Sequence, residues 1–151
     1  MYIFVLAVHS WVRWVALVAG FGATLAAMRD PSPTPNARAE RWGLFLMMAL
    51  DIQLLLGLLL YLGLSPYTAA ARTNFGDAAR DPQLRFWAVD HAAAMFLAVI
   101  LVHAARVLAR TAKTPESRRA RLLVCFGLAT FAMLFGMPWP GLPNGRPLFR
   151  F

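Results

Sequence analysis

The sequence predicts an all-α integral membrane protein whose four helices form an up-down-up-down bundle. Two observations lead to this fold class. The chain of 151 residues is 60% hydrophobic and only 15% charged, whereas soluble domains are about half apolar. It also contains four apolar stretches, roughly 3–28, 42–64, 86–109 and 121–138. Each stretch approaches the ~20 residues with which a helix crosses a hydrocarbon core of about 30 Å.

The elements follow in order along a single predicted domain, 1–151. The stretch 3–28 is expected to remain as a helix rather than to be removed as a signal peptide, because no basic residue precedes its apolar run and Arg13 lies inside it. The segment 65–85 is predicted to lie as a lid on the outer surface. Thr114 and Pro115 provide a start signal for the fourth helix, as N-cap and first helical residue. The proline-rich tail, 138–151, is predicted to be an interfacial cap.

Basic residues predict the orientation of the chain. The segments 29–41 and 106–121 together carry nine Lys and Arg residues, whereas the opposite face carries five, at positions 72, 80, 85, 146 and 150. Short loops rich in Lys and Arg stay in the cytoplasm, so both termini are expected outside it. The net charge of +8 is then explained by this topology and by attraction to anionic lipids of the bilayer. Nucleic acid is not expected as a partner, because the basic residues are divided between two membrane faces.

Two of the three histidines, His9 and His91, are the strongest candidates for a functional site. They fall at similar depths on the first and third helices, which run in the same direction, and each begins a stripe of small residues. One haem iron needs two axial imidazoles from opposite faces of the ring, so matched depth predicts a bis-histidine haem site. Hydrogen bonding between helices is the alternative role. His103 lies roughly 18 Å further along the third helix, which excludes it from this site.

Three arginines are candidates for contacts near this site. Arg13 lies one turn from His9 within the first apolar stretch, where a charged side chain costs about 2.5–3.5 kcal/mol without a partner. It is expected to pair with Asp90 or with a haem propionate, or else to extend toward the outer headgroups. Arg85 and Arg146 belong to the same membrane face and are further candidates for propionate contacts.

The second helix adds two polar residues at mid-membrane depth. Asp51 comes near the level of His103, and we expect the two to pair away from lipid, either as structural bonding between helices or as a proton relay. Gln53 faces another neighbour and is expected to hydrogen-bond a ligand histidine. The only cysteine, Cys125, is expected to be a small buried apolar residue, which leaves no thiolate cluster and no intramolecular disulfide. No nucleophile or phosphate-binding loop is evident, so nothing supports catalysis beyond electron transfer.

At the level of motifs the chain resembles a family of small bacterial four-helix membrane proteins labelled cytochrome b-like. The motifs are His9-Ser-x-x-Arg13-Trp14, Ile52-Gln53 to Gly57 with Tyr61, Arg85-Phe-Trp-Ala-Val-Asp90-His91 with Met95, and Pro138-Trp-Pro140 with Arg146-Pro147. The resemblance covers nearly the whole chain, although family members commonly carry Glu-His where this chain has Asp90-His91. It implies one b-type haem in a bacterial inner membrane. The site residues that it implies are His9, Arg13, Gln53, Arg85 and His91.

The sequence is compatible with two classes of function. In the first, the chain is a b-type cytochrome whose single haem, near the outer (periplasmic) face, exchanges electrons with a quinone, a periplasmic carrier or a partner subunit. In the second, it is a haem-free accessory subunit of a respiratory or photosynthetic membrane complex. A transporter-like or quinone-binding protein is a third, weaker alternative.

Overall fold

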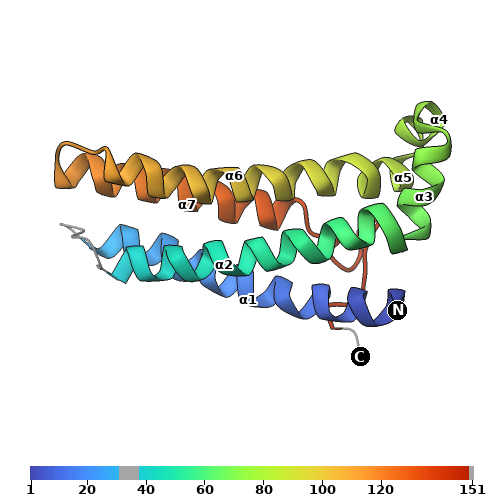
Figure 1. Cartoon of the computed structure of the whole chain (residues 1–151), viewed down its shortest axis with the longest axis horizontal. Coiled ribbons are helices and arrows are strands. Elements are labelled where there is room, and N and C mark those ends of the chain that lie inside the picture. Colours follow the sequence, from blue (N-terminus) through green and yellow to red (C-terminus); the bar gives the residue numbers. More distant parts are fainter. Residues whose placement is uncertain (31–37, 150–151) are drawn as a thin grey trace.

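The structure is a computed structural model that describes residues 1–30 and 38–149, and all regular structure in these ranges is helical. Four long helical stretches lie side by side, and successive stretches run in opposite directions (Figure 1). Three short helices sit at the end that also holds the N-terminus. The elements are α1 (Tyr2–Arg29), α2 (Arg38–Leu59), η1 (Leu60–Leu64), α3 (Pro66–Thr73), α4 (Phe75–Arg80), α5 (Pro82–Arg85), η2 (Phe86–Asp90), α6 (His91–Arg110) and α7 (Pro115–Phe135).

Local capping explains where several helices begin. The Thr114 hydroxyl accepts a hydrogen bond from the Ser117 amide, and Pro115 is the first residue of α7, as the sequence predicts. The Asp81 carboxylate likewise accepts from two amides at the start of α5. The third apolar stretch begins at Pro82 rather than at 86, because α5, η2 and α6 continue into one another. The segment 65–85, which is predicted to form a lid, consists largely of α3, α4 and α5. These helices pack on one another around Ala71 and Ala78.

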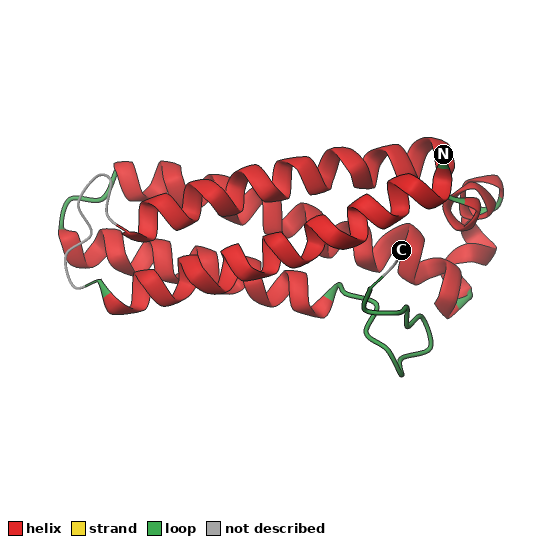
Figure 2. Ribbon diagram, turned by 90° about the horizontal axis from the view of Figure 1, so that it is seen from below, coloured by secondary structure: helices red, strands yellow, loops and turns green. Residues whose placement is uncertain are grey.

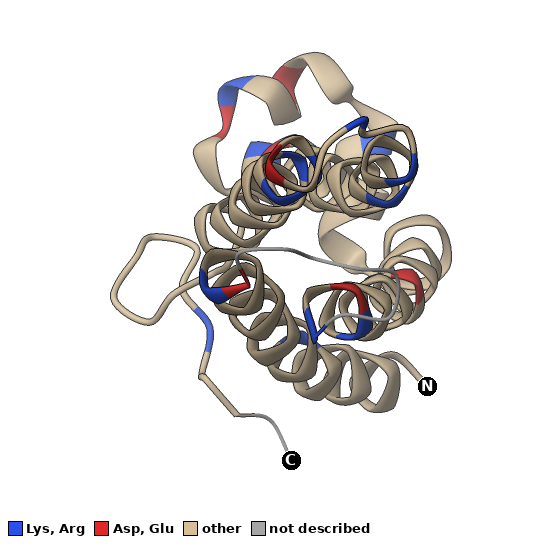
Figure 3. Ribbon diagram, turned by 90° about the vertical axis from the view of Figure 1, so that its left-hand side faces the viewer, with Lys and Arg blue, Asp and Glu red and all other residues tan. Residues whose placement is uncertain are grey.

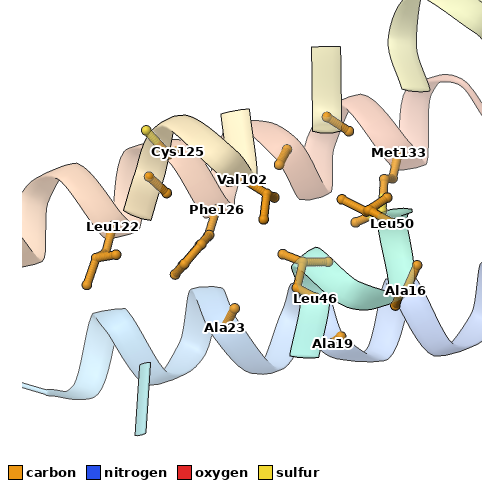
Figure 4. Packing of buried hydrophobic residues seen from close by; sticks show 14 of the residues in the cluster. Ala16, Ala19, Ala23, Leu46, Leu50, Val102, Leu122, Cys125, Phe126 and Met133 are labelled. Carbon is orange, nitrogen blue, oxygen red and sulfur yellow. The ribbon is translucent and has the colours of Figure 1, made fainter. Parts of the chain in front are cut away.

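Small residues let the long helices approach closely. The stripe that follows His9 is buried at Ala16, Ala23 and Ala27, and the stripe that follows His91 is buried at Ala98 and Ala105. In Figure 4, Phe126 of α7 points toward α1 and α2, and its side chain is completely buried. The core thus consists of a few large side chains packed against alanines, an arrangement typical of helices that associate in membranes.

Among the described residues, three continuous helical stretches are long and apolar enough to cross a membrane: Tyr2–Arg29, Arg38–Leu64 and Pro82–Arg110. The predicted fourth stretch, 121–138, does not have those bounds, because α7 starts at Pro115 and ends at Phe135. Arginines occupy the first turns of α7 and cap other helices. Arg119 donates to the carbonyl oxygen of Ala27, at 3.1 Å, and Arg121 to that of Leu108, at 2.8 Å.

Basic residues gather where the long helices begin and end, whereas exposed apolar side chains lie along the sides of the helices. Figure 3 looks onto the end where α1 and α6 finish and α2 and α7 begin, and Lys and Arg side chains belong to each of these helix ends. Large apolar side chains on the sides of the helices are exposed, including Val18 at 60%, Ile100 at 61% and Phe131 at 65%. At the opposite end, the irregular tail after α7 loops beside the helices (Figure 2). The last two residues of the predicted cap lie outside the described ranges.

Candidate functional site

A cavity of about 410 Å³ lies in the half of the molecule that holds the N-terminus. Residues of α1, α2 and α6 form its walls, and η1, α3, η2, the end of α7 and the tail close its outer end. Its volume is within the range of small-molecule and cofactor sites, about 300–1,000 Å³. Both predicted ligand histidines line it, together with Arg13, Gln53 and Arg146. The structure therefore brings five of the six predicted site residues to one cavity.

The His91 ring is oriented by the end of α7. Its Nδ1 donates to the carbonyl oxygen of Gly136 over 2.7 Å, which places the proton on Nδ1 and leaves Nε2 as the nitrogen with a lone pair. A Cβ atom at residue 136 would lie 2.7 Å from Ala94 Cβ and from Met95 Cε. Only glycine therefore allows α7 to end close enough to α6 for this contact. A backbone carbonyl oxygen is a common partner of the N–H group of a metal-ligating imidazole.

The His9 ring is held by Gln53, which is 6% exposed. The Gln53 amide nitrogen donates to His9 Nε2 at 3.1 Å and lies 3.0 Å from the backbone carbonyl oxygen of His9. The predicted hydrogen bond between Gln53 and a candidate ligand histidine is thus confirmed. Within the described part of the chain, His9 Nδ1 and Gln53 Oε1 are buried without a hydrogen-bond partner. Buried polar atoms are rarely left unsatisfied, so these two atoms have hydrogen-bonding capacity that no described residue uses.

The two imidazoles, one from α1 and one from α6, lie edge-on to each other in the cavity. Their ring centroids are 6.3 Å apart, with an angle of 69° between the planes. A metal ion bound to two imidazole nitrogens by bonds of about 2 Å holds the ring centroids about 6 Å apart. No group of three or more His, Cys, Asp or Glu side chains that could hold a metal occurs among the described residues.

Two π-helical turns shape the outer end of the cavity and were not expected from the sequence. The Tyr61 hydroxyl of η1 donates to the Ala88 carbonyl oxygen of η2 at 2.9 Å, which ties the two turns together. Trp87 of η2 packs on His91, with ring centroids 5.8 Å apart, and its buried Nε1 has no hydrogen-bond partner in the described residues. Such π turns often occur at functional sites. Their aromatic residues can be read from the sequence, but the spacing of the residues does not predict a π-helical turn.

The three candidate arginines have different surroundings. Arg13 donates to the carbonyl oxygen of Leu148 in the tail over 2.7 Å and lies over the Trp14 ring. Arg146 lies over the rings of Tyr67 and Trp87. Arg85 does not line the cavity. It forms an exposed ion pair with Asp90, 3.4 Å away, which is the carboxylate considered above as a partner for Arg13.

Outside the cavity, the predicted pair of Asp51 and His103 is confirmed. His103 Nε2 lies 3.6 Å from Asp51 Oδ1, and His103 Nδ1 donates to the Val99 carbonyl oxygen over 3.0 Å. The two side chains are 44% and 47% exposed, so the expectation that the pair would be shielded from lipid is wrong for the isolated chain. The reason is that α2 and α6 pack less closely than the other neighbouring long helices. Cys125 is buried, as predicted.

Comparison of the chain with protein families, with curated proteins and with solved structures finds no match. The resemblance to cytochrome b-like proteins therefore stays a prediction.

Proposed function

We propose that the chain is a bacterial cytoplasmic-membrane protein whose four long helices form an up-down-up-down bundle with both termini outside the cytoplasm. Support comes from the three membrane-length helices, the exposed apolar side chains and the basic end seen in Figure 3. The apolar part of α7, 122–135, is about 21 Å long. This length is shorter than a hydrocarbon core of about 30 Å. For α7 to cross the membrane, the arginines of its first turns would therefore have to extend into the headgroups.

Single cysteines test this orientation in a Cys125→Ser background. Arg80, whose side chain is 84% exposed, lies at the predicted outer end, and Lys113 lies in the turn between α6 and α7. A membrane-impermeant maleimide is expected to label Arg80→Cys in spheroplasts and to label Lys113→Cys only after lysis. The reverse pattern would contradict the proposed orientation.

We propose further that the cavity binds one b-type haem between His9 and His91, and that the protein transfers electrons. The observation that carries this proposal is the pair of imidazoles that line one cavity with their ring centroids 6.3 Å apart. Bound haem supplies a one-electron iron centre. The chain supplies the two nitrogen ligands, and the Gly136 carbonyl fixes the His91 ring with Nε2 as its free nitrogen. As it stands, the hydrogen bond from Gln53 occupies the lone pair of His9 Nε2. With the Gln53 amide turned over, its Oε1 would accept from His9 Nε2–H and leave the lone pair on Nδ1, and both Oε1 and Nδ1 are buried without a partner in the described residues.

The apolar wall of the cavity favours a flat macrocycle over a hydrated ion. Leu54, Leu58 and Val99 line it, together with the thioethers of Met133 and Met137, and none of these side chains carries a charge. A hydrated metal ion without a macrocycle would find only two imidazoles there. Exclusion of water by such side chains also stabilises a low-charge cofactor and tunes its reduction potential.

The test is a reduced-minus-oxidised visible spectrum of the protein purified from haem-replete cells. We expect b-type bands with one haem per chain. A colourless protein that stays colourless after incubation with haem would contradict haem binding.

A role as a subunit of a larger membrane complex is the second candidate, favoured by the Asp51–His103 pair. Asp51 is the middle residue of the stretch Arg38–Leu64, about 20 Å from either end. A half-exposed pair of ionisable side chains at this depth is costly in lipid, so a neighbouring protein is expected to cover it.

A photo-cross-linking residue at Leu55, which is 68% exposed one turn from Asp51, tests this contact in native membranes. We expect an adduct with another polypeptide. The matched control is Phe131, which is 65% exposed on α7, a helix that packs on α1 and α6. Absence of an adduct from Leu55, or equal adducts from both positions, argues against a specific partner at this face.

A further inference from the structure

The guanidinium of Arg146 lies over two adjacent aromatic rings at the outer end of the cavity. Its Cζ is 4.9 Å from the ring centroid of Tyr67 and 5.1 Å from that of Trp87. The two rings are 6.2 Å apart and tilted, and they come from α3 and η2. All three side chains line the cavity. Arg146 is thus held at the cavity by the faces of its neighbours, an arrangement that Arg favours over Lys.

The backbone of the tail places Arg146 there. The Arg146 amide donates to the Pro138 carbonyl oxygen at 3.1 Å, and the Gly145 amide donates to that of Leu142 at 2.8 Å. A Cβ atom at residue 145 would lie 2.6 Å from the Trp139 carbonyl oxygen and 2.8 Å from that of Leu142. Because these are backbone atoms of a tight turn, only glycine fits at this position. The turn immediately before Arg146 therefore requires glycine at residue 145. A turn with this requirement favours a defined position for the Arg146 side chain.

The hydrogen-bond donors of Arg146 are available to a ligand. Within the described ranges its guanidinium contacts ring faces and has no hydrogen bond or ion pair. Ring faces do not accept from the guanidinium edge, so its five N–H donors remain for a planar anion. No acidic side chain is among the described residues that line the cavity, so nothing from the protein competes for them.

The other two candidate arginines have protein partners, although Arg13 also lines the cavity. Arg13 donates to the Leu148 carbonyl oxygen, and Arg85 pairs with Asp90 away from the cavity. On the basis that the cavity holds haem as proposed above, we propose that Arg146 forms a carboxylate subsite. The ligand is then a porphyrin with free carboxylates, and its propionate edge is turned toward the tail. This subsite gives the otherwise apolar cavity a preferred ligand orientation.

Titration of the haem-free protein in detergent with two compounds tests the subsite. Iron protoporphyrin IX carries free propionates, and its dimethyl ester does not. We expect the wild-type protein to bind the free acid about tenfold or more tightly than the ester, as befits hydrogen bonds to a charged group. Arg146→Gln is expected to lose this preference while its affinity for the ester stays unchanged. Arg80→Gln removes a charge at the same end of the molecule, from an exposed side chain, and should behave as wild type.

The outcomes separate the subsite from haem binding itself. Equal affinity of the wild-type protein for acid and ester, or an Arg146→Gln variant that keeps the preference, overturns the subsite and leaves haem binding intact. Failure of the wild-type protein to bind either compound overturns haem binding instead. Equal affinity of the wild-type protein for acid and ester overturns the subsite even if the variant folds poorly.

Discussion

Replacing either His9 or His91 by alanine is expected to abolish the b-type visible bands. In the proposed haem site each imidazole would supply one nitrogen from rings whose centroids are 6.3 Å apart, and loss of either would leave the iron with one ligand from the protein. The measurement is the reduced-minus-oxidised spectrum of each purified variant, at matched protein concentration. Added imidazole is expected to restore the bands in part, because it fits the space that the deleted side chain leaves. Such rescue distinguishes a ligand from a residue that merely supports the fold.

His103→Ala is the matched control for these variants. It removes the third histidine, which lies outside the cavity beside Asp51, and is expected to leave the bands unchanged. Circular dichroism checks that all three variants keep their helical content. Full retention of the bands in both His9→Ala and His91→Ala would contradict the proposed haem site.

Gly43→Ala is expected to destabilise the fold by about 1–3 kcal/mol, in the range found for overpacked cores. A Cβ atom at residue 43 would lie 2.3 Å from Phe126 Cζ, and the Phe126 side chain is completely buried. The ring therefore has no solvent-exposed side toward which to move, and α2 and α7 have to separate. Thermal unfolding in detergent, followed by circular dichroism, should show a midpoint lowered by several degrees.

Gly127→Ala is the control for the intrinsic effect of the substitution. Alanine is about 1 kcal/mol more favourable than glycine inside a helix, and a Cβ atom at residue 127 meets only Thr24 Cγ2, at 3.9 Å. This variant should therefore unfold at the same or a higher temperature than wild type. If Gly43→Ala is as stable as Gly127→Ala, the close contact between Gly43 and Phe126 does not exist in the protein.

Much of the candidate site is predictable from counting residues along apolar helices. A rise of about 1.5 Å per residue places His9 and His91 at one depth and His103 at another, and the structure agrees with both placements. The helical period also predicts that the small residues after each histidine face the core. These are local properties of a regular helix, so composition and spacing carry them.

Other features of the site depend on contacts between distant segments. Arg85 and Arg146 were equal candidates by sequence, yet only Arg146 lines the cavity. The tail reaches the cavity through a turn at Gly145, and no periodic pattern describes such a turn. The π-helical turns η1 and η2 widen the helices locally, and they shift the side chains that follow away from the ideal helical period.

The sequence by itself determined the helical class, the approximate limits of the apolar helices, the N-cap at Thr114 and the matched depth of the two histidines. These follow from hydrophobic burial and from hydrogen bonding within a few residues. Only the tertiary structure decided which group holds each imidazole ring, because Gly136 and Gln53 lie 45 and 44 residues from the rings they contact. It also decided that the Asp51–His103 pair faces outward. Depth along a helix is a local quantity, whereas the partner of each polar atom is set by how the helices pack.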